Sequence, residues 1–230
     1  MNSIYNPTLV VLSVLIAVFS SYTALELTGR IAASSQAAVR RLWLLAGAVT
    51  MGTGIWSMHF IALLAFELPA NFHLNFGAVI FSNLISVAGC GVALWLASQP
   101  RLTRGMLLSG GAVMGICICL MHFNDLQGMK GASAVRYEPL LYLCSVLISV
   151  AASVAAIRMA YTLRGQETPD GIRSRMLAAA VLGLAISGVH YIGMAATQFL
   201  APAAAGDETH AAATAFIVAA SVLVLLDRKS

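Results

Sequence analysis

Charged side chains are scarce in this 230-residue chain, at 10% of its residues, whereas 60% are hydrophobic. A soluble domain carries about 25% charged residues, and the mean hydropathy here is +0.87. This composition excludes an ordinary soluble protein and places the chain in a lipid bilayer. It also leaves no stretch polar enough for a separate soluble domain.

Cysteine is also rare, and its four positions show no pattern typical of a disulfide scaffold. Cys117 and Cys119 are separated by one residue, and no CxxC spacing occurs. All four cysteines fall inside apolar runs, which favours small buried side chains over bridges. A basic segment before the first apolar run is missing too, so that run does not resemble a cleaved secretion signal.

Seven apolar runs are present, each close to the ~20 residues that a membrane-spanning helix needs. They predict an all-α membrane protein with seven transmembrane helices. The predicted spans are about 8–27, 43–66, 76–97, 105–127, 139–160, 176–198 and 210–226.

The basic residues are distributed unevenly between the two ends of these spans. All except Lys130 and Arg136 fall on one side, among them Arg30, Arg101 and Arg175. The positive-inside rule places that side in the cytoplasm, so the N-terminus is predicted outside and the C-terminus inside. The formal net charge of +4 therefore indicates membrane topology and no nucleic-acid partner.

A short motif occurs three times, once in each even-numbered predicted span. The copies read GTGIWSMHF (52–60), GICICLMHF (115–123) and GLAISGVHY (183–191), and share the pattern G-x2-I-x2-[MV]-H-[FY]. Their histidines lie 63 and 68 residues apart, which is one helical hairpin per copy. Repetition at such a period indicates a repeated structural unit, so we predict three tandem two-helix repeats followed by a seventh helix.

The repeated histidines are the first candidates for function. In each copy a glycine precedes the histidine by two helical turns, on the same face, where it allows close helix packing. His59, His122 and His190 should therefore point into the bundle, at one depth in the outer half of the membrane. Buried packing explains a lone histidine in an apolar helix, but three at equal depth favour a shared metal or cofactor site.

Three neutral imidazoles suit copper, zinc, iron or nickel. Met58, Met121 and Met194 lie next to the imidazole layer in sequence, and their thioethers shift the preference to copper over zinc. A ligating histidine usually donates its other N–H to an acceptor. Asp125 and Asn83 are the two candidates for that acceptor.

These residues resemble the signatures of the MHYT domain, a bacterial membrane sensor module. The resemblance rests on MHF at 58–60, MHF at 121–123 and VHYIGM at 189–194, and it covers essentially the whole chain as one domain, residues 1–230. It implies a periplasm-facing copper site that uses methionine and histidine, an input of oxygen, carbon monoxide or nitric oxide, and cytoplasmic diguanylate cyclase and phosphodiesterase domains. The family's Gly-Met pair after the motif is Ala62-Leu63 in the first copy and Asp125-Leu126 in the second, and Val189 replaces the third leading methionine.

Three classes of function follow. The first is a non-enzymatic sensor in the bacterial inner membrane, in which helix 210–226 relays a gas or redox signal to a cytoplasmic domain or partner. The second is copper binding or transport, and the third is a haem or zinc protein. A zinc hydrolase is the least favoured, because no glutamate lies in the imidazole layer to act as a base. A homodimer stays possible in each case.

Overall fold

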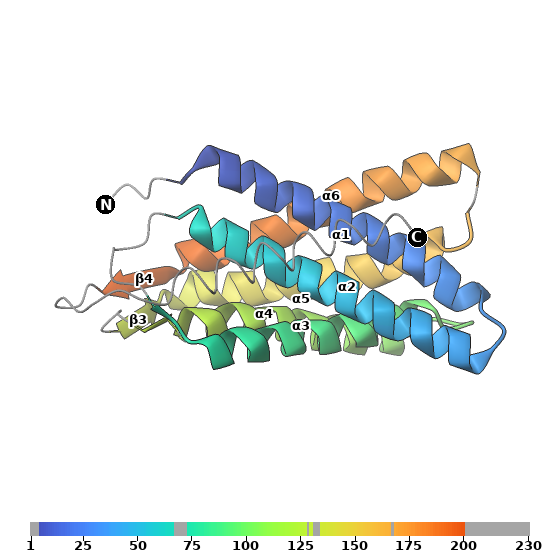
Figure 1. Ribbon diagram of the computed structural model, residues 1–230, viewed down its shortest axis with the longest axis horizontal. Helices are drawn as coiled ribbons and strands as arrows, with labels where there is room; N and C mark the ends of the chain where they lie inside the picture. Colours follow the sequence, from blue (N-terminus) through green and yellow to red (C-terminus); the bar gives the residue numbers. More distant parts are fainter. Residues whose placement is uncertain (1–4, 67–72, 128, 131–133, 167, 201–230) are drawn as a thin grey trace.

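The computed structural model describes residues 5–66, 73–127, 129–130, 134–166 and 168–200. Six helices lie side by side along the long axis (Figure 1), and each is long and apolar enough to cross a membrane. They are α1 (Pro7–Ala33), α2 (Ala37–Leu64), α3 (Phe76–Ala97), α4 (Arg104–Gln127), α5 (Pro139–Leu163) and α6 (Pro169–Ala195). The predicted seventh helix, 210–226, lies outside the described residues.

Several helices are longer than the apolar runs that predicted them. The predicted spans 8–27, 43–66 and 176–198 miss more than one turn of α1, α2 and α6, and the span 139–160 stops three residues before the end of α5. An apolar run marks the part of a helix in hydrocarbon, whereas the helix continues where arginine side chains reach the polar interface. The predicted end of the sixth span, residue 198, is three residues too late. The helix ends at Ala195, and a strand follows it.

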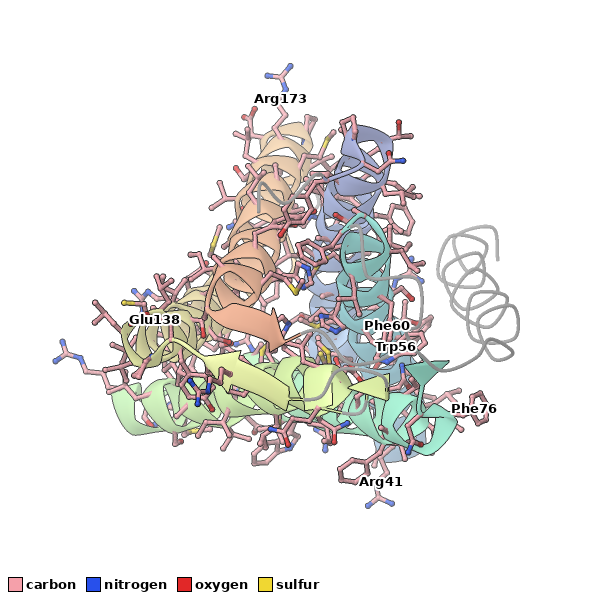
Figure 2. All side chains as sticks on the ribbon, turned by 90° about the vertical axis from the view of Figure 1, so that its left-hand side faces the viewer. Arg41, Trp56, Phe60, Phe76, Glu138 and Arg173 are labelled. Atoms are coloured by element: carbon pink, nitrogen blue, oxygen red, sulfur yellow. The ribbon has the colours of Figure 1, made fainter. Side chains whose placement is uncertain are left out.

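Four short strands occur at one end of the bundle, which the all-helical prediction did not include. They are β1 (His73–Leu74), β2 (Met129–Lys130), β3 (Ala134–Tyr137) and β4 (Thr197–Leu200). We call this end, where α2, α4 and α6 finish, the strand end, and the other the arginine end. Figure 2 shows β3 and β4 lying across the strand end.

The strand pairings tie each odd-numbered helix to the even-numbered helix that follows it. A Tyr5–Phe66 bridge joins the start of α1 to the end of α2. In the same way, β1, which precedes α3, pairs with β2, which follows α4. The strand β3, which precedes α5, pairs with β4, which follows α6. The described residues therefore form three hairpins, each closed by antiparallel pairing at the strand end.

The three hairpins pack on one another in a ring, in which each helix contacts its sequence neighbours and α6 returns to α1. The glycine of each motif copy lies against a valine backbone of the neighbouring hairpin. A Cβ added at Gly52 would lie 2.5 Å from Val87 Cα, at Gly115 2.7 Å from Val150 Cα, and at Gly183 2.6 Å from Val18 Cα. The predicted role of these glycines in close helix packing is confirmed, and the ring has pseudo-threefold symmetry. Membrane orientation stays a prediction.

Candidate metal centre

The three motif histidines occupy equivalent places in their helices. His59, His122 and His190 each lie five residues before the last residue of α2, α4 and α6. All three are buried, with 1%, 5% and 3% of their surface exposed. Equal distances from the helix ends and the symmetric packing of the helices place the side chains in one layer near the strand end.

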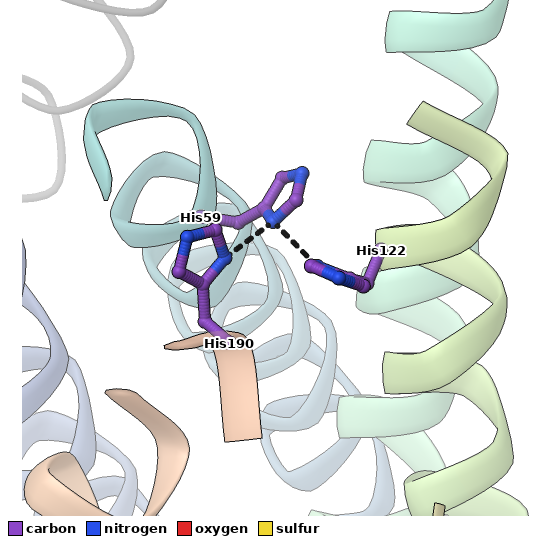
Figure 3. Close-up of side chains that lie close together, drawn as sticks. All are labelled: His59, His122 and His190. Atoms are coloured by element: carbon purple, nitrogen blue, oxygen red, sulfur yellow. Dashed lines mark hydrogen bonds between the residues drawn. The ribbon is translucent and has the colours of Figure 1, made fainter. Parts of the chain in front are cut away.

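The rings converge on a common point, with His59 between the other two (Figure 3). His59 Nδ1 lies 3.0 Å from His190 Nδ1 and 3.2 Å from His122 Nδ1. The ring centroids are 4.9 to 5.3 Å apart, and the planes are close to perpendicular. One ligand nitrogen from each residue lies within 4.8 Å of the others, so the predicted convergence is confirmed.

This arrangement fits a metal ion better than it fits a packed apolar core. A neutral imidazole carries one N–H and one lone pair, so His59 Nδ1 can form a hydrogen bond with one of its two neighbours but not with both. The three Nε2 atoms make no hydrogen bond within the described part of the chain. Ligand nitrogens about 2.0–2.1 Å from a tetrahedral metal lie roughly 3.3 Å apart, which is close to the two spacings that involve His59 Nδ1.

Asp125 is a buried carboxylate next to the imidazoles. Its side chain is fully shielded, and its Oδ2 lies 3.4 Å from His59 Nε2. The contact is made between α4 and α2, so the aspartate of one motif helix approaches the histidine of another. With the three Nδ1 lone pairs turned to a cation, the N–H of His59 would be on Nε2, where Asp125 can accept it.

The other predicted participants lie around this core. Asn83 is half-buried on α3, where its amide donates to Thr53 Oγ1 at 3.4 Å. Met58, Met121 and Met194 are buried in the apolar core of the bundle. The ligation of a metal by these thioethers, and by the histidines themselves, stays a prediction.

Four residues at the site were not singled out from the sequence. Phe60, Phe123 and Tyr191 each follow a histidine and pack edge-on against its ring, at centroid distances of 5.1, 4.9 and 5.1 Å. They restrict the rotation of the imidazoles, and the [FY] position of the motif was the signal that could have found them. Gly193 lies against His122, and its signal was the Gly-Met pair that follows the third copy of the motif, Gly193-Met194.

Fold and site together define a multi-pass helical membrane protein with a buried three-histidine centre. The MHYT family model, described as a bacterial signalling protein N-terminal repeat, matches residues 52–110 and 115–169. The two matches begin at Gly52 and Gly115, the glycines that pack against valine in the ring. The chain belongs to the MHYT family, and the resemblance noted from its three motifs is confirmed.

Curated relatives are signalling proteins. The chain is 41% identical over 202 residues to the bifunctional diguanylate cyclase/cyclic di-GMP phosphodiesterase MucR of Pseudomonas aeruginosa, covering 86% of this chain and 28% of MucR. It is 34% identical over 196 residues to the signaling protein YkoW of Bacillus subtilis, covering 85% and 24%. It is 32% identical over 212 residues to the cyclic di-GMP phosphodiesterase NbdA of P. aeruginosa, covering 92% and 27%. The chain thus spans about a quarter of each relative, and no solved structure matches it.

Proposed function

We propose that this chain is a non-enzymatic membrane sensor domain that binds copper through His59, His122 and His190. The observation that carries the proposal is the approach of His59 Nδ1 to both partner Nδ1 atoms, at 3.0 and 3.2 Å, inside a buried layer. Bound copper would supply a redox couple and a coordination position for a diatomic gas. The matched region in relatives named for cyclic di-GMP turnover supports a sensory role linked to that messenger.

The protein residues have separate tasks in this proposal. The three imidazoles hold the ion, and Asp125 fixes the tautomer of His59 and offsets positive charge in a site without solvent. Phe60, Phe123 and Tyr191 hold the rings in place. Because each ligand comes from a different hairpin, a change in ligand positions would move the hairpins relative to one another, and a cytoplasmic domain or partner would read that movement.

The proposal is tested by measuring bound metal in the purified protein. Copper content by mass spectrometry should be close to one ion per chain and should fall below a tenth of that in the triple His→Ala variant. Because that variant is at risk of misfolding, single His→Gln variants should each weaken copper binding while eluting as a folded species. Nitrogen hyperfine coupling in the Cu(II) spectrum should report imidazole ligands. Unchanged copper retention in the triple variant would exclude this site.

Copper transport is the second candidate, and one observation favours it. Met51 and Met114, two soft donors, line a cavity on the arginine side of the histidines. Copper uptake into proteoliposomes distinguishes the two functions. Uptake that depends on both methionines supports transport, whereas a protein that binds copper without moving it supports sensing.

A further inference from the structure

A cavity lies among the six helices, between the histidine layer and the arginine end. Its volume is about 30 Å³, and residues of all six described helices line it. Its lining includes Met51 and Met114, each eight residues before a motif histidine, and Ile186, four residues before His190. At 1.5 Å per residue, the cavity lies about 6–12 Å from the histidines along the helix axes.

The cavity results from the repeat itself. Ala24, Ala93 and Ala156 line it from α1, α3 and α5, and each lies six residues after the valine that meets a motif glycine. Three methyl groups therefore occur where larger side chains would fill the interior. Protein interiors contain few voids larger than a water molecule, so a void bounded by equivalent alanines of all three hairpins is a candidate binding site.

The polarity of the wall restricts what that occupant is. The lining is apolar except for the hydroxyl of Ser21. That side chain is 3% exposed, and its Oγ has no hydrogen-bond partner in the described part of the chain. A buried water needs two to four polar partners, whereas a neutral diatomic molecule needs at most one weak hydrogen bond. Hard ions and polar metabolites would lose their hydration without replacement, because the only further donors in the wall are the thioethers of Met51 and Met114, which suit a soft ion alone.

A second, smaller cavity continues toward the histidines. Its volume is about 10 Å³, and it shares four lining residues with the first cavity, Met114, Ala156, Leu182 and Ile186. It reaches Val189, the residue before His190, and Ser153 lines it with another buried hydroxyl that lacks a partner among the described residues. The two cavities adjoin along α4, α5 and α6, and the smaller one extends toward the histidines as far as Val189.

We propose that the larger cavity is a binding site for a small neutral apolar molecule of the diatomic-gas class, separate from the metal centre. Ser21 donates the single hydrogen bond, and the smaller cavity is the route by which the ligand reaches the imidazoles. The biological identity of the ligand rests on the proposed sensing function. The site itself requires no metal and is testable without one.

The test uses metal-free protein with ¹³C-labelled methionine methyl groups, studied by NMR under xenon and under carbon monoxide. Both gases should shift the methyl signals of Met51 and Met114 in a saturable manner, while Met176, exposed on the outer surface, shifts linearly with pressure. Ala156→Leu fills the cavity and should weaken gas binding at least tenfold. Ala155→Leu is the matched control, because Ala155 is the exposed neighbour on the same helix, and it should leave binding unchanged.

Ala93→Val fills the same cavity with less added volume and serves if Ala156→Leu does not fold. Ser21→Ala should preserve xenon binding and weaken carbon monoxide binding several-fold. Non-saturable shifts, equal effects of the Ala155 and Ala156 variants, or water contacts at both methyl groups without a gas shift would overturn the proposal. Copper content, measured separately, distinguishes failure of the copper centre from failure of the gas cavity. Gas binding in a protein that binds no copper would contradict the proposed copper sensor and leave the cavity proposal standing.

Discussion

At the scale of single residues, Asp125 is the group whose position has the most direct chemical consequence. A buried carboxylate is costly unless a positive charge or hydrogen-bond donor compensates it. The basic group that faces it is the His59 imidazole, whose Nε2 lies 3.4 Å from Asp125 Oδ2. Asp125→Asn keeps the shape and removes the charge, so copper affinity should fall about 10- to 100-fold, as for other acceptors behind ligating histidines.

The measurement for Asp125→Asn is a competition titration against a copper chelator. Asp170→Asn is the control, because Asp170 is an exposed residue in the first turn of α6, at the arginine end. It should bind copper as the unaltered chain does. Equal affinities for the two variants would show that Asp125 has no role in metal binding.

Gly193 allows an equally local test of the histidine layer. A Cβ added there would lie 2.6 Å from His122 Nε2, so Gly193→Ala must displace the imidazole. We expect copper affinity to drop tenfold or more and the Cu(II) spectrum to change. Gly188→Ala, on the same helix with nothing within 4 Å of the added Cβ, should change neither. A normal spectrum in Gly193→Ala would mean that His122 is not a ligand.

The three histidines could be predicted from sequence because one motif repeats them at the same helical position. Their neighbours could not, because those contacts depend on how the helices are rotated against each other. Asp125 lies three residues from His122 yet contacts His59 on another helix. Asn83, a second candidate at the same depth, is turned to Thr53. Helix rotation is set by packing of the whole ring, which no local pattern encodes.

At the scale of helices and strands, hydropathy located the six described helices but not their ends. The ends depend on local capping, as where the side chain of Asn6 accepts hydrogen bonds from the first turn of α1 and that of Thr168 caps α6. The strands were missed because pairings such as Ala134–Tyr137 with Thr197–Leu200 join segments far apart in sequence. Two to four residues per strand give too short an alternating pattern to detect.

The glycine of the second motif copy should control how closely α4 and α5 pack. A Cβ at Gly115 would lie 2.7 Å from the backbone of Val150, and backbone cannot move aside as a flexible side chain can. Gly115→Ala should therefore destabilise the fold by about 1–3 kcal/mol, the usual cost of overpacking. Thermal unfolding in detergent measures it as a lower Tm.

Gly105→Ala provides the comparison for Gly115→Ala within the same helix. Its added Cβ would meet no atom closer than 4.0 Å, and alanine is the better helix former. Its Tm should be unchanged or slightly higher. An unchanged Tm in Gly115→Ala would show that α4 and α5 do not need to approach this closely.

At the scale of the whole molecule, the ring closes where α6 meets α1, and two polar contacts hold that junction. Near the strand end, Tyr191 Oη and Ser13 Oγ lie 3.2 Å apart. Near the arginine end, the largely buried Arg175 donates from Nη1 to Glu26 Oε2 at 2.6 Å. The junction joins the first and last described hairpins, so its loss would open the ring at one point.

The Arg175–Glu26 pair should therefore contribute to the stability of the closed ring. Arg175→Met keeps the unbranched apolar stem and removes the charge, which leaves Glu26 with the more distant Arg30 at 3.8 Å. Glu26 is about one-third exposed, so solvent offsets part of the loss, and we expect a cost of about 1–2 kcal/mol, below the 3–5 kcal/mol of a fully buried pair.

The Tm of Arg175→Met should fall by several degrees, whereas Arg173→Met, at an outward-pointing arginine (Figure 2), should leave it unchanged. In a double-mutant cycle with Glu26→Gln, the second substitution should cost little once Arg175 is gone. Additive losses would show that the two side chains act independently and that apolar packing alone closes the ring.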